Sequence, residues 1–238
     1  MNKMKKLGKI LTIVALATAL FACSDDDGGE PFEIIGDVFV IKRTMDDEVK
    51  YANSYAAWGN QPMSMAKVTT PLGAEITLSP ASENSYTYAK EPTTSDYSTA
   101  WPVEDNYQFL VINEDITHQA VDLLDFDDIE FSTISSTGFV GTDLSVEWES
   151  NPLAEAYMIR LFNANKQIAF LSQTLPTQMT RLDFGPGTAS GSWSETPEAG
   201  KVYTLELLTF RFEDDATSSD AAFHIQEIAI TETEVTWQ

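Results

Sequence analysis

Short runs of alternating apolar and polar residues recur through this chain, and they limit the folds that it can adopt. Leu144, Val146 and Trp148 alternate with Ser145 and Glu147. Successive side chains of a β-strand point to opposite faces, so this pattern predicts a strand with one buried face. No long stretch shows the 3.6-residue period of an amphipathic helix. The sequence therefore predicts an all-β fold.

Further strands follow in the second half of the chain. Residues 157–162 alternate in the same way, residues 163–166 supply turn chemistry, and residues 167–171 return, which predicts a hairpin. A later alternating run, 202–207, has an early tyrosine, Tyr203, that is placed for a tyrosine corner.

Together, the strand ending at Trp148, the Tyr157 strand and the corner at 199–203 resemble a fibronectin type III domain over about the last hundred residues. A related immunoglobulin-like sandwich has the same strand pattern and stays an alternative. We expect Trp148 and Tyr203 to lie in the core. The resemblance implies a non-catalytic module more often than an enzyme, although this fold hosts unrelated functions.

The first half repeats the strand pattern less clearly. Pro102 precedes Tyr107 much as Pro197 precedes Tyr203. The runs that we interpret as its strands are 36–42, 75–78 and 107–111. We therefore expect two tandem immunoglobulin-like or fibronectin type III-like β-sandwiches. Their predicted ranges are 32–127 and 128–238.

Residues 1–22 have the layout of a secretory signal. Four lysines within the first nine residues precede an uncharged run that ends before Cys23, the only cysteine. The apolar run is too short to cross a membrane as a helix. Leu20-Phe21-Ala22-Cys23 resembles the lipobox of bacterial lipoproteins, which implies that Cys23 is lipidated. The alternative is an ordinary signal peptide with a chance cysteine.

The segment 23–31 is acidic and poor in apolar residues, so we expect a flexible linker. It resembles the export signal of Bacteroidetes-type surface lipoproteins, and a plain solvated spacer is the alternative. The resemblance implies a protein that is lipid-anchored in the outer membrane and faces the cell exterior.

The charge of the chain limits its partners. It has 14 basic and 37 acidic residues, a formal net charge of -23. Such a surface repels phosphate backbones, so no nucleic-acid partner is expected. Cations, neutral glycans and basic proteins remain as ligand classes, and the membrane is a partner through the lipid anchor.

The histidine content argues against an enzyme. His118 and His224 are the only histidines and fall in different predicted domains, which excludes a histidine-rich metal site. Neither belongs to a recognisable catalytic motif. Paired carboxylates need only the right separation in space, so a glycoside-active enzyme stays a lesser alternative.

Calcium is the one cofactor that the sequence suggests. Acidic clusters lie at predicted turns or junctions, at 46–48, 125–130 and 213–215. Carboxylate and carbonyl oxygens are the ligands that Ca²⁺ prefers. The candidate ligands at the domain junction are Asp125, Asp127, Asp128 and Glu130. The alternative is a set of solvated turns on an acidic protein.

Aromatic residues outside the clear core runs suggest glycan binding, because exposed rings can stack on the apolar faces of sugars. The candidates are Tyr86, Tyr88, Tyr97, Trp101 and Trp193. The alternative is that these rings close the ends of the cores. We therefore expect a surface binding module for glycans or partner proteins, as an accessory to nutrient uptake, or else a structural or adhesive protein whose sandwiches form a stalk.

Overall fold

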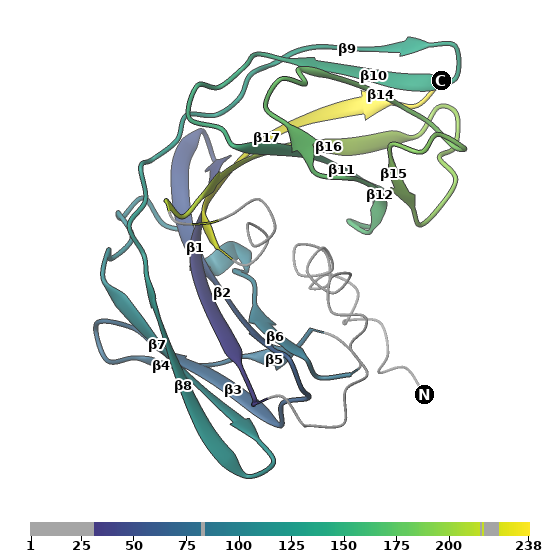
Figure 1. Ribbon diagram of the computed structural model, residues 1–238. Helices are drawn as coiled ribbons and strands as arrows, with labels where there is room; N and C mark the ends of the chain where they lie inside the picture. Colours follow the sequence, from purple (N-terminus) through teal and green to yellow (C-terminus); the bar gives the residue numbers. More distant parts are fainter. Residues whose placement is uncertain (1–30, 82–83, 215, 217–223) are drawn as a thin grey trace. The chain divides into compact units, whose positions relative to one another are not determined.

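The computed structural model of the chain (Figure 1) describes residues 31–81, 84–214, 216 and 224–238. The predicted signal peptide, Cys23 and nearly all of the acidic linker lie outside these residues, so the predictions about them stay predictions. In the described part of the chain, no helix has the length and the apolar content needed to cross a membrane.

The described residues are nearly all β-structure, which confirms the predicted fold class. They form seventeen strands and one 3-10 turn, η3 (Thr94–Asp96). The strands of the first half are β1 (Ile34–Met45), β2 (Glu48–Gly59), β3 (Met65–Thr69), β4 (Glu75–Thr77), β5 (Ser79–Pro80), β6 (Thr87–Lys90), β7 (Asn106–Asn113) and β8 (Ile116–Leu123). Those of the second half are β9 (Ile134–Val140), β10 (Asp143–Trp148), β11 (Ala156–Phe162), β12 (Ile168–Ser172), β13 (Leu175–Pro176), β14 (Arg181–Phe184), β15 (Gly191–Trp193), β16 (Val202–Phe212) and β17 (Ile225–Thr236).

The chain divides into two compact units that are not contiguous in sequence. Unit 1 contains the described residues up to Val40, together with Tyr51–Phe126 and Phe212–Gln226. Unit 2 contains Ile41–Lys50, Asp127–Arg211 and Glu227–Gln238. A simple split of the chain near residue 127 would place segment 41–50 in unit 1 and segment 212–226 in unit 2. The contacts assign each of them to the other unit.

Unit 2 is a sandwich of two sheets. One sheet has the order β14-β10-β9, and the other contains β15-β12-β11-β16-β17. Leu144, Val146 and Trp148 of β10 are buried in one cluster with alternate residues of β11 and β16, as the alternation predicted. The predicted hairpin is the antiparallel pair β11 and β12.

The strand arrangement of unit 2 is that of an immunoglobulin-like sandwich. In chain order, β9, β10 and β14 form one sheet, while β11, β12, β16 and β17 lie in the other. Tyr203 is buried, and its hydroxyl accepts a hydrogen bond from the Glu198 backbone N–H at 3.0 Å, which makes the predicted tyrosine corner. The fold expected from the resemblance is therefore confirmed for this unit.

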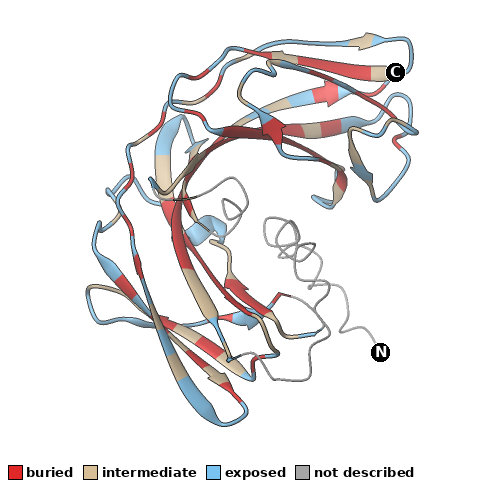
Figure 2. Cartoon of the chain, in the orientation of Figure 1, coloured by how far each residue is buried: buried red, intermediate tan, exposed pale blue. Residues whose placement is uncertain are grey.

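Unit 1 also packs one sheet on another. The sheet β4-β3-β7-β8 faces strands from the series β1-β2-β6-β5. Buried and more exposed residues alternate along β7 (Figure 2), and its buried Phe109 shares a core with Val38 and Val68. A β-carbon at Gly36 would overlap the Phe109 ring, so this close packing requires glycine.

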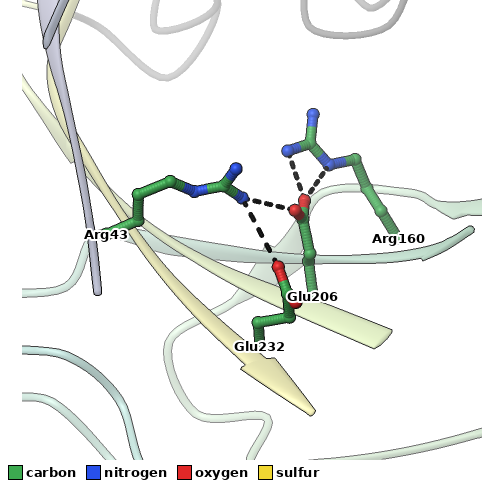
Figure 3. Close-up of polar contacts among 4 residues, drawn as sticks. All are labelled: Arg43, Arg160, Glu206 and Glu232. Carbon is green, nitrogen blue, oxygen red and sulfur yellow. Dashed lines mark hydrogen bonds and ion pairs between the residues drawn. The ribbon is translucent and has the colours of Figure 1, made fainter. Parts of the chain in front are cut away.

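A charged network lies within the large sheet of unit 2 (Figure 3). Arg160 of β11 and Glu206 of β16 are directly opposite each other, and both are buried. The Glu206 carboxylate accepts hydrogen bonds from Arg160 Nη2 and from Arg43 Nη2, each at 2.5 Å. Burial alone would raise the pKa of Glu206, but the two guanidinium groups outweigh it and hold that pKa below its usual value.

We expect Glu206→Gln to lower the free energy of unfolding by about 3 kcal/mol, because it leaves a buried guanidinium without its counter-charge. Chemical denaturation measures this loss. The matched control is Glu232→Gln, whose exposed carboxylate lies 4.0 Å from Arg43 Nη2, and which should change stability by less than ~1 kcal/mol. Equal losses in the two variants would contradict this account of the network.

Candidate functional site

A groove of about 330 Å³ opens on unit 1 and is lined by aromatic and polar side chains. Its rings are Tyr51, Tyr55, Trp101 and Tyr107, and its polar groups include Asn53, Thr70, Lys90, Asp96 and Ser98. An apolar surface with a few placed polar groups is typical of small-ligand sites. Trp101 is the one predicted glycan residue that lines this groove.

Trp101 is supported from behind and remains accessible. Its ring stacks on the buried Phe126 ring, with centroids 4.7 Å apart and planes at 24°. Its centroid also lies 5.4 Å from that of Tyr51, and its indole N–H donates to Glu104 Oε1 at 2.9 Å. The residue nevertheless keeps 50% of its surface exposed. A flat ring held in this way can stack on a ligand without first being ordered.

The loop that carries Trp101 is fixed at two points. The backbones of Tyr51 and Ser98 exchange two hydrogen bonds, at 2.8 and 3.0 Å. Just before this bridge, Thr93 N–H donates to Asp96 Oδ2 at 2.7 Å and caps η3. The loop is therefore attached to β2 on one side of Trp101, and the start of β7 follows on the other.

The polar groups of the groove have defined protonation. Tyr107 donates its hydroxyl to the Val103 carbonyl at 3.0 Å and accepts from Asn53 Nδ2 at 2.9 Å. Burial raises the pKa of Tyr107 to about 12, so the phenol is neutral at physiological pH. Hydrogen bonds from the Thr93 hydroxyl and N–H lower the pKa of Asp96, so that side chain is an anionic acceptor. The groove thus offers hydrogen-bond donors and acceptors beside an exposed ring.

The structure does not gather the other predicted glycan residues in this groove. Tyr88 is buried and donates its hydroxyl to the Met63 carbonyl at 3.0 Å. Trp193 belongs to unit 2, where it packs 4.7 Å from the Phe170 ring and donates to the Gly185 carbonyl. Tyr86, just before β6, and Tyr97, just after η3, are half-buried and do not line the groove. The contacts of Tyr88 and Trp193 are those of rings that pack in the cores, which was the alternative to glycan binding.

Three residues that line the groove lie on one strand and were not predicted from the sequence. Tyr51, Asn53 and Tyr55 of β2 are two residues apart, so their side chains point to the same face. This spacing is visible in the sequence. The spacing indicates a binding surface only when β2 is known to lie beside the loop of Trp101, which is about fifty residues further along the chain.

The carboxylates predicted to bind calcium at the junction have other partners. Lys42 Nζ lies 2.7 Å from Asp128 Oδ1, and Arg211 Nε lies 3.2 Å from Asp127 Oδ2. Asp125 and Glu130 are exposed. Among the described residues, the acidic groups that converge closely enough for a metal ion lie elsewhere, in unit 1. Calcium binding at the junction stays a prediction.

Both histidines belong to unit 1, although the sequence placed them in different domains. The reason is that the segment 212–226 joins unit 1 rather than the unit that precedes it in the chain. His118 packs against Phe32 with ring centroids 4.5 Å apart. His224 Nδ1 lies 2.9 Å from Glu213 Oε2. Neither histidine lines the groove.

A buried carboxyl group next to the junction acidic residues has an unusual acidity. Glu227 Oε2 accepts from the Ile129 backbone N–H at 2.9 Å. Burial raises the pKa of Glu227 to about 7, opposed by that hydrogen bond and by Lys42 and reinforced by Asp128 and Asp127. The folded state therefore binds this proton more tightly than the unfolded state does.

Because the folded pKa of Glu227 is the higher one, its contribution to stability falls as pH rises from about 4 to about 7 and is constant above that. We expect Glu227→Gln to remove up to ~1.4 kcal/mol per pH unit of this decline. Urea denaturation of both proteins at several pH values measures the difference. Parallel pH profiles for the two proteins would show that Glu227 titrates normally.

No protein-family model and no curated protein sequence matches the chain. Among solved structures, it is similar to a segment of two fibronectin type III domains from chicken tenascin, with 8% identity, 77% of this chain and 91% of that chain covered, and a TM-score of 0.29. It is also similar to the BSP domain of a biofilm-associated protein, with 13% identity, 84% and 29% covered, and a TM-score of 0.23. A tetra-tandem repeat from the extending region of a large adhesion protein gives 10% identity, 85% and 49% covered, and a TM-score of 0.23. Likenesses at these TM-scores assign neither a residue nor a function to this chain.

Proposed function

We propose that this chain is a cell-surface lipoprotein whose folded part is a non-catalytic binding module, and that the Trp101 groove of unit 1 binds glycans. The anchor rests on the leader sequence and on Cys23, which precedes an acidic linker. The same leader supports lipid attachment in the outer membrane with the folded part outside the cell. The binding role rests on the groove.

The half-exposed Trp101 ring is the observation that carries the binding proposal. A ring backed by Phe126 presents a rigid apolar surface, which suits the C–H face of a sugar. The neighbouring Asn53, Lys90 and Asp96 offer donors and an acceptor for sugar hydroxyl groups. The strongly acidic surface favours a neutral glycan over a polyanionic one.

The chemistry of the groove supports binding rather than catalysis. Tyr107 is a neutral phenol at physiological pH, and Asp96 is an anion held by Thr93. General acid-base catalysis needs a group with a pKa near the working pH, whereas these two groups are displaced from it in opposite directions. Asp96 therefore suits fixed hydrogen bonding to a ligand, while the buried Tyr107 holds Asn53 and the Val103 backbone in place.

One observation favours an adhesive or structural role as a second candidate. Strand β8 lies at the edge of its sheet, and Val121 and Leu123 are 61% and 52% exposed on it. These two residues share one face of the strand. An edge strand with exposed apolar side chains can pair with or pack against another protein.

The test is a glycan-panel screen of the soluble chain from Asp25 onward, followed by affinity measurement on the best ligand. We expect Trp101→Ala to weaken binding about tenfold or more, the equivalent of ~1.4 kcal/mol of lost stacking. Trp101→Phe should retain part of the affinity, because a smaller ring can still stack on Phe126 and on the ligand.

The matched control is Leu72→Ala, which removes a side chain that is 81% exposed in a turn outside the groove. It should bind as the unchanged chain does. Melting temperatures of all variants separate lost binding from lost folding. A panel on which no glycan binds, or a folded Trp101→Ala that binds normally, would remove the basis of the glycan proposal and favour the adhesive role.

A further inference from the structure

Three carboxyl groups, none of which lines the Trp101 groove, converge in unit 1. They are Asp37 of β1, Asp122 of β8 and Glu213, which directly follows β16. One carboxylate oxygen of each lies within 4.8 Å of the corresponding oxygens of the other two. Asp37 and Asp122 are buried, and Glu213 is partly buried.

Asp37 has a buried oxygen that no hydrogen bond satisfies. The residue is completely buried, and its Oδ1 has no hydrogen-bond partner among the described residues. Its Oδ2 faces the Ile225 backbone N–H at 3.4 Å, which is a weak contact. Burial of an ionised carboxylate without compensation is strongly unfavourable. A ligand that supplies positive charge would remove this penalty.

Backbone and histidine contacts hold the other two carboxylates in place. The Val38 N–H donates to Asp122 Oδ2 at 2.6 Å. His224 Nδ1 lies 2.9 Å from Glu213 Oε2, and the Glu213 N–H donates to the His224 carbonyl at 2.9 Å. Carboxylates that bind a metal ion are commonly held by hydrogen bonds of their own. These contacts fix the direction of both carboxyl groups.

The basic side chain that contacts this cluster is His224, through Glu213. No lysine or arginine of the described residues forms an ion pair with Asp37 or Asp122. Burial, with the charges of Asp122 and Glu213, raises the pKa of Asp37 well above its ordinary value. Burial also raises the pKa of Asp122 to about 7, reinforced by Glu213 and opposed by the Val38 hydrogen bond and by the charge of His224. Burial is the largest cause of both shifts, and the neighbouring carboxyl groups add to it.

We propose that Asp37, Asp122 and Glu213 bind a divalent cation of the hard, oxygen-preferring class, with Ca²⁺ as the fitting ion. All three donors are oxygens, whereas a zinc site would favour nitrogen or sulfur ligands. Oxygens within 4.8 Å of one another need only small side-chain adjustments to reach about 2.4 Å from a common centre, the Ca–O distance. Backbone carbonyls and water complete such a coordination shell.

This site differs from the junction cluster that the sequence suggested. Its ligands come from three segments far apart in the chain, so a bound ion would cross-link β1, β8 and the end of β16 within unit 1. Binding to the folded state alone raises stability in proportion to the logarithm of the ion concentration. The cation would therefore act as a structural element of unit 1.

The experiment measures the melting temperature of the soluble chain at neutral pH in millimolar calcium chloride and in EDTA. We expect calcium to raise it by on the order of 5 °C. Asp37→Asn should lose this response. It should also melt higher than the unchanged chain in EDTA, because folding of the unchanged chain at neutral pH has either to protonate this carboxyl group or to bury its charge, and both cost stability.

Asp127→Asn is the control, because it alters the junction cluster and leaves the three carboxylates in place. It should keep the full calcium response. Asp122→Asn serves as a second variant should Asp37→Asn fail to fold, and titration calorimetry should find one bound Ca²⁺ per chain that this variant loses. Equal melting temperatures in calcium and EDTA, a response that survives Asp37→Asn, or one that Asp127→Asn abolishes would each overturn the proposal.

Discussion

Burial of paired apolar sheet faces is the interaction on which both units depend. A chain with one cysteine cannot form an internal disulfide, so it lacks the inter-sheet cross-link found in many immunoglobulin-like domains. Trp148 and Tyr157 in unit 2, and Tyr107 and Phe109 in unit 1, are large side chains that are almost completely inaccessible to solvent. Each large ring excludes a considerable area from water, and the core has to be well packed for that gain to be realised.

Features that depend on local sequence pattern could be predicted, whereas features that depend on pairing between distant segments could not. The β10 strand and the Tyr203 corner follow from alternation and from a tyrosine a few residues after a turn, so both were predictable. The Trp101 groove was predictable only in part, because Trp101 was recognised and Tyr51 was not. The carboxylate cluster was beyond the sequence pattern, since nothing local relates Asp37 to Asp122.

Buried charge is handled in opposite ways at Glu206 and at the Asp37 cluster. In unit 2, Glu206 lies between Arg160 and Arg43, and its acidity increases. In unit 1, Asp37 and Asp122 lie beside other carboxyl groups, and their acidity decreases. In an ion pair the opposite charges compensate each other and no ligand is needed. Converging like charges have to take up protons or a cation. Charge balance thus distinguishes a structural network from a place where binding is expected.

The contrast between Trp101 and the other indole rings has an optical consequence. Trp58, Trp148 and Trp237 are each 5% exposed or less, Trp193 is partly buried, and Trp101 is half exposed. Emission from the buried rings should lie at shorter wavelengths, and a water-soluble quencher such as acrylamide should reach Trp101 before it reaches them. The chain therefore contains an intrinsic fluorescent reporter, whose red-shifted, quenchable component belongs mainly to the loop that borders the groove.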